Sequence, residues 1–248
     1  MNPLIVIPAR MAATRLPGKP LADIHGEPMI VHVWRRAMAA GVGPVLVAAG
    51  DAEIARAVEK AGAVAVLTRP DHPSGSDRVF EAAGRFDAAG RHDVIVNLQG
   101  DLPTLEPAAL TSVLAPLKDP AVDIATIAVE IRNAEERAAS SVVKAVAALG
   151  PDRRIARALY FTRVACPWGE GPLYHHIGLY AFRRGALQRF VELPHGQLEQ
   201  REKLEQLRAL EAGLRIDVAL VDMEPFGVDT PADLERARAL LARGGLRK

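Results

Sequence analysis

Short β-branched apolar runs alternate with amphipathic stretches along the first part of the chain. The first run, Leu4 to Ile7, stops at Pro8 and is typical of a strand buried on both faces of a parallel sheet. Between the runs, apolar residues recur at helical spacing. This order, with right-handed crossovers, predicts a Rossmann-like α/β fold, a mostly parallel sheet flanked by helices. The predicted strands are 4–7, 45–49, 63–67 and 94–98, and the predicted helices are 28–40, 51–61 (capped by Asp51), 79–86 and 107–117.

The alternation of strands and helices weakens after residue 133. Several strand-like runs follow with little helical spacing between them, so we expect a single domain over 1–248 with a strand-rich insertion at about 133–190. One amphipathic helix is predicted over 198–210, and a last helix is predicted to open at Pro231 with Thr230 as its cap. The predicted strands of this part are 124–129, 140–146, 155–161, 174–182 and 216–221.

The loop that follows the first strand is basic. Over residues 8–20 it carries Arg10, Arg15 and Lys19 and no acidic residue. Its spacing is not that of a Walker loop, because Gly-x-x-x-x-Gly-Lys-Ser/Thr is absent. The loop suits a polyanion, although a solvated basic loop would have the same composition. Its small residues, which let backbone N–H groups approach a ligand, are Ala9, Ala12, Ala13 and Gly18.

Further polar segments lie where predicted strands end. Ser-Gly-Ser-Asp-Arg at 74–78 precedes a predicted helix and suits either a polar ligand or a simple helix cap. Asp101 leaves the carboxyl end of the strand at 94–98, where ligands of open α/β sheets bind, so it is either a metal ligand or a turn residue. Asp229 sits between the last strand and the last helix, where it could equally assist the cap. His175 and His176 are adjacent on a predicted strand and face opposite sides, which disfavours a zinc site.

The composition limits the class of protein. With 31 Lys and Arg against 30 Asp and Glu, no excess charge favours nucleic acid or an anionic membrane as a partner. One cysteine, Cys166, permits no internal disulfide. No apolar run approaches the roughly 20 residues that span a bilayer, and the N-terminus does not resemble a secretory leader. We therefore expect a cytoplasmic protein that binds neither nucleic acid nor membrane.

Several motifs together resemble a known family. Residues 8–21 read Pro-Ala-Arg-x-x-x-Thr-Arg-Leu-Pro-Gly-Lys-Pro-Leu, which resembles the signature of sugar nucleotidyltransferases. In this form it is similar to the cytidylyltransferases that activate 3-deoxy-manno-octulosonate (Kdo), the CMP-Kdo synthetases. The resemblance runs from Ile5 to about Leu241. Its other motifs are Gln-Gly-Asp-x-Pro (99–103), Tyr-Phe-x-Arg (160–163), His-x-Gly-x-Tyr (176–180), Leu-Glu-Gln-Leu-Arg (204–208) and Gly-Val-Asp-Thr-Pro (227–231).

The resemblance implies transfer of CMP from CTP to the anomeric hydroxyl of Kdo, giving CMP-Kdo and pyrophosphate for lipopolysaccharide biosynthesis. It implies Mg²⁺ held by Asp101 and Asp229, with Lys19 and Arg10 as further catalytic residues. It also implies a homodimer formed through the inserted strands. The implied nucleotide-binding residues are Pro8, Ala9, Arg10, Arg15, Lys19, Ser74, Gly75, Arg78 and Gln99. The implied sugar-binding residues are Gln99, Arg163, His176, Tyr180, Glu205 and Gln206.

The sequence departs from the family pattern at two places. Leu102 stands where the family usually has Glu, and Ala139-Ser140-Ser141 stands where relatives have Asn-Pro-Asn. Two other functions remain open. One is the activation of 8-amino-Kdo or another acidic sugar on the same scaffold, and the other is a non-catalytic nucleotide-binding module, which would be expected to lack one of the two metal aspartates.

Overall fold

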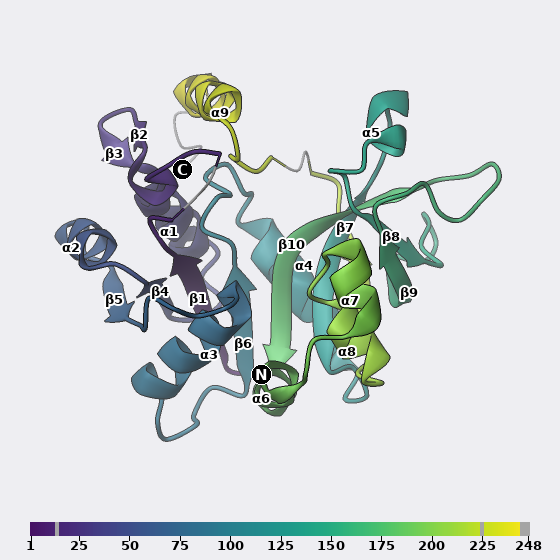
Figure 1. Cartoon of the computed structure of the whole chain (residues 1–248), viewed down its shortest axis with the longest axis horizontal. Coiled ribbons are helices and arrows are strands. Elements are labelled where there is room, and N and C mark those ends of the chain that lie inside the picture. The colour runs from purple at the N-terminus through teal and green to yellow at the C-terminus, as the bar shows by residue number, and fades with distance from the viewer. Residues whose placement is uncertain (13–14, 224–225, 244–248) are drawn as a thin grey trace. The chain divides into compact units, whose positions relative to one another are not determined.

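The first apolar run forms the buried centre of strand β1, as predicted, and the other runs of the N-terminal part form strands beside it (Figure 1). The computed structural model describes residues 1–12, 15–223 and 226–243. The chain divides into two units: unit 1 is Met1–Leu110 with Pro225–Lys248, and unit 2 is Thr111–Glu224. Unit 2 contains the whole segment 133–190 and extends beyond it at both ends.

Unit 1 is the α/β part of the chain. Its strands lie in the order β5, β4, β1, β6, and each neighbouring pair is parallel, as predicted. Its elements are β1 (Pro3–Ala9), the 3-10 helix η1 (Lys19–Leu21), β2 (Asp23–Ile24), β3 (Glu27–Pro28), α1 (Met29–Ala39), β4 (Val45–Ala49), α2 (Ala52–Lys60), β5 (Val64–Leu67), α3 (Gly75–Phe86), β6 (Val94–Leu98) and α9 (Pro231–Arg243), with α4 (Ala108–Leu114) at the boundary to unit 2.

The order of strands in unit 1 reverses at β1. The chain passes from β1 through α1 to β4 and through α2 to β5, and then returns through α3 to β6 on the other side of β1 (Figure 1). Right-handed crossovers in opposite directions place α1 and α2 on one face of these strands and α3 on the other. The carboxyl ends of β1 and β6 therefore flank the point where open α/β sheets bind ligands.

The start of one helix of unit 1 differs from the prediction. Helix α3 begins at Gly75 rather than at residue 79, because the Ser74 hydroxyl accepts a hydrogen bond from the backbone N–H of Asp77 and caps it. Strand β5 lies within the predicted range 63–67, and Val64 and Leu67 are exposed because β5 is last in the strand order. The apolar run alone does not distinguish an edge strand from a central one.

The C-terminal helix α9 returns to unit 1 and brings Asp229 with it. Leu234 and Ala237 of α9 form a buried cluster with Ile24 and Met29. The backbone N–H of Asp233 donates to the Thr230 hydroxyl, as the predicted cap requires. Asp229 lies more than a hundred residues beyond β6 in the sequence. It nevertheless belongs to the same unit as β1 and β6.

Unit 2 is rich in antiparallel strands. Strand β7 pairs with β11 in parallel and with β10 in antiparallel orientation, and β9 pairs with β11 and β8 in antiparallel orientation. This arrangement agrees with the loss of strand–helix alternation in the sequence. Its elements are η2 (Ala115–Lys118), β7 (Ile124–Glu130), α5 (Ala134–Ala138), β8 (Lys144–Ala147), β9 (Ile155–Thr162), β10 (Tyr174–Arg183), α6 (Arg184–Glu192), α7 (Gln197–Glu202), α8 (Leu207–Glu211) and β11 (Ile216–Leu220).

The single helix predicted over 198–210 is wrong: the structure has two short helices, α7 and α8. Helix α7 ends at Lys203, whose φ of 57° and ψ of 45° are left-handed. The Lys203 carbonyl accepts from the Arg163 guanidinium and not from a backbone N–H four residues ahead. The apolar spacing of leucines predicts helix throughout, and only this long-range contact interrupts it.

Candidate functional site

A pocket of about 390 Å³ lies in unit 1 at the carboxyl ends of β1 and β6. Its volume falls within the range of small-molecule sites. Every residue of unit 1 that the sequence predicts for nucleotide or metal binding lines this pocket. Of the small residues of the basic loop, Ala9 and Ala12 line it, and Ala13 lies outside the described residues. The lining residues are Pro8, Ala9, Arg10, Ala12, Arg15, Leu16, Lys19, Pro20, His72, Ser74, Gly75, Arg78, Gln99, Gly100, Asp101 and Asp229.

The Lys19 ammonium joins the two aspartates predicted as metal ligands. Its Nζ is 2.8 Å from Oδ2 of Asp101 and 3.1 Å from Oδ1 of Asp229. Arg15 adds a second cation, with Nη2 2.9 Å from Oδ2 of Asp229. Burial lowers the pKa of Lys19, but the attraction and hydrogen bonds of the two carboxylates outweigh burial and raise that pKa above its ordinary value. The pocket therefore holds two aspartates beside an ammonium that both of them stabilise.

The donor set of this pocket fits Mg²⁺ together with a phosphate. Asp101 and Asp229 both reach the Lys19 Nζ, so their oxygens lie close to one point. Among the described residues no group of three or more His, Cys, Asp or Glu side chains could hold a metal by itself. Mg²⁺ is commonly bound by one or two carboxylates plus substrate phosphates and water, which is the set that two aspartates and a bound triphosphate would supply.

The basic loop is fixed to the neighbouring strand by Asp51. The carboxylate of Asp51 accepts a hydrogen bond of 2.8 Å from the backbone N–H of Met11. Asp51 was predicted to cap the helix that follows β4, and this prediction is wrong: its side chain makes no capping bond with α2. Gly18, whose φ of 68° favours glycine, closes the loop through a bond from its N–H to the Met11 carbonyl.

Arg78 is almost fully buried at the wall of the pocket. Its Nη1 donates to the Thr68 hydroxyl and to the Arg69 carbonyl, and Nη2 donates to the Pro70 carbonyl. Burial and the nearby charge of Arg10 lower the pKa of Arg78. Gly50 allows this packing, because a Cβ at that position would lie 2.6 Å from Arg78 Nη1. Arg78 therefore shapes the pocket through the loop before α3 as well as lining it.

Sequence reasoning missed two residues of this site. His72 lines the pocket and hydrogen-bonds to Glu81 of α3, which also accepts from the backbone N–H of Arg69. Gly100 also lines the pocket and is required by its neighbours, since a Cβ there would lie 2.9 Å from the Pro8 carbonyl oxygen. Both residues follow strands of one sheet, His72 after β5 and Gly100 after β6, so the rule that pointed to Asp101 could have found them.

The two departures from the family pattern have structural explanations. Leu102 is 8% exposed and packs next to Gly227, so an apolar contact replaces the usual acid. In unit 2, the segment 139–141 contributes backbone carbonyls: Ala139 accepts from Lys144 Nζ and Ser140 from Arg163 Nη1. Contacts of this kind do not depend on side-chain identity.

Unit 2 brings together the aromatic residues predicted for the sugar. The His176 ring lies between two other rings: it meets Phe161 edge-on, with centroids 4.9 Å apart, and Tyr180 at a tilt, with centroids 5.3 Å apart. The register of β10 shifts between Ile177 and Tyr180, and the Thr126 hydroxyl bonds there to the Ile177 and Leu179 carbonyls and to His176 Nε2. Thr126 was not predicted, and its apolar strand gives no signal for it.

The other sugar candidates of unit 2 lie at the end of β9 and after α7. Arg163 donates to the carbonyls of Ser140, Glu202 and Lys203, so its guanidinium is held by backbone. The charge of Glu205, together with burial, raises the pKa of Tyr180, which places Glu205 near that ring. Gln206 is buried, and its Nε2 has no hydrogen-bond partner among the described residues. A direct role of Arg163, Glu205 or Gln206 in binding a sugar stays a prediction.

Burial makes His176 a source of pH-dependent stability. It lowers the pKa of His176 to about 3, whereas an unfolded histidine has a pKa of about 6.5. Between these values the unfolded chain binds a proton that the folded chain excludes, so stability falls as the pH falls from 6.5. We expect this group to cost about 2 kcal/mol of the free energy of unfolding at pH 5 relative to pH 7. His176→Gln should remove that part of the pH dependence.

Urea unfolding of wild type and His176→Gln at pH 7 and pH 5 measures this difference. The variant should be less stable at pH 7 but should lose less stability on acidification. His25→Asn, a change at an exposed histidine, is the matched control and should retain the wild-type dependence. Equal acid destabilisation of His176→Gln and wild type would show that His176 is not buried in its neutral form.

Comparisons with known proteins agree over nearly the whole chain. A family model described as cytidylyltransferase matches residues 4–216. A 3-deoxy-manno-octulosonate cytidylyltransferase of Paramagnetospirillum magneticum is 66% identical over 241 residues, which cover 97% of this chain and 98% of that protein. The protein of that name from Rhodospirillum centenum is 67% identical over 240 residues, covering 97% and 93% respectively. A solved CMP:2-keto-3-deoxy-manno-octonic acid synthetase complexed with CTP matches with a TM-score of 0.88 and 42% identity, covering 98% of this chain and 99% of that one.

Proposed function

The chain belongs to the cytidylyltransferase family, and from this premise we propose that it transfers CMP from CTP to the anomeric hydroxyl of Kdo, releasing pyrophosphate and CMP-Kdo. The observation that carries the proposal is the pocket of unit 1, where Lys19 joins Asp101 and Asp229 beside the basic loop. Relatives that are named for this reaction, and a similar structure that holds CTP, support the choice of substrates.

The reaction asks mainly for positioning and for neutralisation of charge. The sugar hydroxyl oxygen forms a bond to the α-phosphorus, the bond to the bridging oxygen of the pyrophosphate breaks, and the hydroxyl proton is released. Attack must be in line with the leaving group. Arg10, Arg15 and Lys19 supply cations for the triphosphate, the arginines as planar forks and the lysine as a point charge. The described lining of the pocket holds no cysteine, and its serine and histidine bond to other partners: the Ser74 hydroxyl donates to Asp77, and His72 hydrogen-bonds to Glu81. Neither arrangement suggests a covalent intermediate.

We propose Asp101 and Asp229 as the residues that hold Mg²⁺. When bound, Mg²⁺ supplies charge neutralisation for the triphosphate and activation of the attacking oxygen. The two carboxylates already converge on the ammonium of Lys19, so the chain keeps their mutual repulsion low before a substrate arrives. Arg15 holds the second oxygen of Asp229 and orients that side chain.

We propose that the sugar acid is bound by a group of polar side chains in unit 2. The group is formed by Arg163, His176, Tyr180, Glu205 and Gln206. A Kdo molecule brings one carboxylate and several hydroxyls, and this group offers a cation, donors and acceptors. The unpartnered Gln206 amide supports a polar ligand in unit 2. The same inventory could select an amino sugar acid, so the sugar needs a direct measurement.

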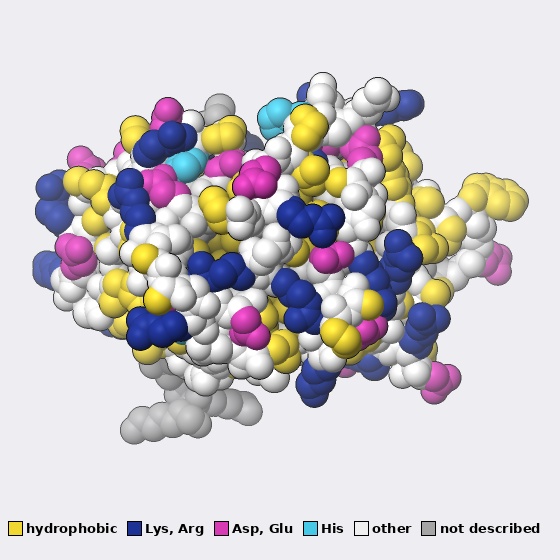
Figure 2. All heavy atoms as spheres, turned by 90° about the horizontal axis from the view of Figure 1, so that it is seen from below, with side chains coloured by type: hydrophobic (Ala, Val, Ile, Leu, Met, Phe, Trp, Pro, Cys, Tyr) yellow, Lys and Arg dark blue, Asp and Glu magenta, His cyan; other side chains and the backbone are white. Residues whose placement is uncertain are grey.

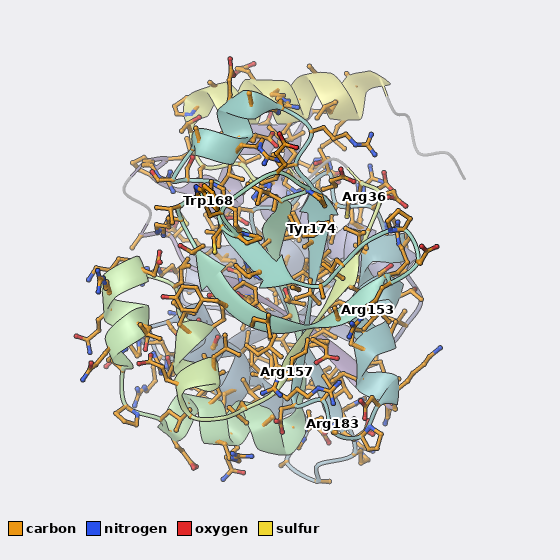
Figure 3. All side chains as sticks on the ribbon, turned by 90° about the vertical axis from the view of Figure 1, so that its right-hand side faces the viewer. Arg36, Arg153, Arg157, Trp168, Tyr174 and Arg183 are labelled. Atoms are coloured by element: carbon orange, nitrogen blue, oxygen red, sulfur yellow. The ribbon has the colours of Figure 1, made fainter. Side chains whose placement is uncertain are left out.

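A homodimer, a cytoplasmic location and a role in lipopolysaccharide biosynthesis complete the proposal. Exposed apolar side chains of unit 2 support self-association: Leu159 of β9 is 68% exposed and Trp168 is 99% exposed. Figure 3 labels Trp168 on the side of the chain that shows the strands of unit 2, and apolar side chains also project at the right-hand edge of Figure 2. No helix among the described residues has the length and apolar character needed to cross a bilayer. Light scattering of the purified protein would give the subunit number.

A pyrophosphate-release assay tests the proposed function. Each of four nucleoside triphosphates is combined with Kdo, 8-amino-Kdo and a neuraminic acid, with Mg²⁺ present. We expect turnover with CTP and Kdo and at least tenfold lower kcat/KM with the other nucleotides. A strong preference for 8-amino-Kdo would replace the sugar and keep the cytidylyltransferase reaction. Binding of CTP without any turnover would favour a nucleotide-binding module.

A further inference from the structure

The turn between α7 and α8 in unit 2 holds an unusual backbone conformation. Its first residue, Lys203, is left-handed, with φ of 57° and ψ of 45°. Residues with a Cβ seldom adopt this region unless contacts outside the segment enforce it. After Leu204 the turn continues with Glu205 and Gln206, both proposed to meet the sugar acid. The backbone conformation of Lys203 therefore sets the backbone positions that carry the Glu205 and Gln206 side chains.

The contacts that enforce this turn come from the end of β9. Arg163 Nε donates to the Glu202 carbonyl at 2.7 Å, and Nη2 donates to the Lys203 carbonyl at 3.2 Å. In a continuous helix those two carbonyls would accept backbone N–H groups four residues ahead. Arg163 takes their place, so the helix can stop at Lys203 without leaving these carbonyls unpaired.

The side chain of Glu202 completes the connection in the opposite direction. Its Oε1 accepts from the Thr162 hydroxyl at 2.8 Å, and its Oε2 accepts from the backbone N–H of Arg163 at 3.1 Å. Burial, and after it the nearby charge of Glu202, raise the pKa of Tyr160. Glu202 thus holds the backbone of β9 while Arg163 holds the backbone of the turn.

The end of β9 that Glu202 contacts also carries one of three aromatic side chains that touch one another in unit 2. Phe161 directly precedes Thr162 and meets His176 edge-on, and His176 in turn contacts Tyr180 at a tilt. Lys144 also fixes this end of β9. Its side chain is fully buried, and its Nζ donates to the Arg163 and Ala139 carbonyls. Glu202 therefore connects the turn to the end of β9. Through this connection it holds the turn at a fixed position relative to Phe161, His176 and Tyr180.

We propose that Glu202 is a positioning residue for the sugar acid, acting through Thr162 and Arg163 to hold the turn that presents Glu205 and Gln206. This inference rests on the proposed function. Glu202 itself uses both carboxylate oxygens within the protein and contacts no substrate. The buried Gln206 amide lacks a partner among the described residues, so a small displacement of the turn changes the fit of a polar ligand directly. The nucleotide pocket of unit 1 has none of these contacts.

Glu202→Gln tests the inference because it keeps the shape and removes one acceptor. The new amide nitrogen would face either the Arg163 N–H, which can only donate, or the Thr162 hydroxyl, which already accepts from the backbone N–H of Val164. We expect KM for Kdo to rise at least tenfold, while the dissociation constant of CTP stays within twofold of wild type. Thr162→Val, a milder change that removes one of the two bonds, should raise KM for Kdo about threefold. Glu170→Gln, at an exposed position of unit 2, is the matched control and should leave both constants unchanged.

The outcomes separate the inference from the proposed function. Failure of wild type to use Kdo would remove the proposed function and this inference with it. Turnover by wild type with an unchanged KM for Kdo in a folded Glu202→Gln would overturn the inference alone. An equal loss of CTP and Kdo binding, or a loss of melting temperature without a change in KM, would show that Glu202 serves stability only. If Glu202→Gln does not fold, an unchanged KM in Thr162→Val overturns the inference.

Discussion

Asp101→Asn should lower the single-turnover rate at least roughly 1,000-fold, which corresponds to about 4 kcal/mol of activation free energy. An amide keeps the shape of the carboxylate but is a poor ligand for Mg²⁺ and carries no charge to oppose that of Lys19. The fold should survive, because Lys19 keeps its contact with Asp229 and the Asp101 carbonyl keeps its bond from the Val228 N–H. We expect the melting temperature to fall by about 2–4 °C.

Single-turnover kinetics and thermal unfolding of the same preparation test this expectation. Asp152→Asn replaces an exposed aspartate in unit 2 and should retain wild-type rate and melting temperature. A rate for Asp101→Asn within about tenfold of wild type, or roughly 1.4 kcal/mol, would remove Asp101 from the catalytic group. A large loss of melting temperature would instead assign the lost activity to unfolding.

Lys19→Ala should raise the dissociation constant of CTP by roughly 100-fold, or about 2.7 kcal/mol. The Lys19 side chain is 17% exposed, and its ammonium contacts both Asp101 and Asp229. Its loss removes one cation from the triphosphate. It also leaves Asp101 without this cation and Asp229 with Arg15 alone, so more negative charge faces a polyanion. Both effects act against the nucleotide in the same direction. The sugar-binding group proposed in unit 2 does not involve Lys19.

Calorimetric titration of CTP measures the affinity of wild type and variant. Lys60→Ala, which removes an exposed lysine at the end of α2, controls for the loss of one surface charge and should change the affinity less than twofold. Unchanged CTP affinity in Lys19→Ala would mean that the loop after β1 serves another ligand. That result would also remove the main support for a triphosphate site in unit 1.

Local patterns were sufficient for most of unit 1. The apolar run from Leu4 to Ile7 and the bounds of β6 agree with the structure because buried parallel strands need continuous β-branched residues. The position of Asp101 followed from the same reasoning, since the carboxyl end of a parallel strand faces the ligand site. The predictions were wrong where a side chain could form a hydrogen bond with more than one partner. Asp51 could cap α2 or hold the basic loop, and it holds the loop.

Unit 2 shows why periodicity alone was insufficient. The leucines over 198–210 predict one helix. Arg163, which lies about 40 residues earlier, donates to the Glu202 and Lys203 carbonyls in place of helical N–H groups, and α7 ends there. The bulge of β10 likewise depends on Thr126 of another strand. No local pattern contains such contacts, because they join residues that come together only after the strands have paired.

The sequence by itself determined the class of fold, the basic loop and both aspartates, because strand burial, loop charge and helix caps are encoded within a few residues of one another. Only the tertiary structure decided that Lys19 joins Asp101 to Asp229, residues 128 positions apart in the chain. It also decided that His72 lines the same pocket, that Asp51 holds the basic loop and that Glu202 connects the end of β9 to the turn after α7. The physical reason is that hydrogen bonds and ion pairs between distant segments are fixed by the packing of whole elements and not by local spacing.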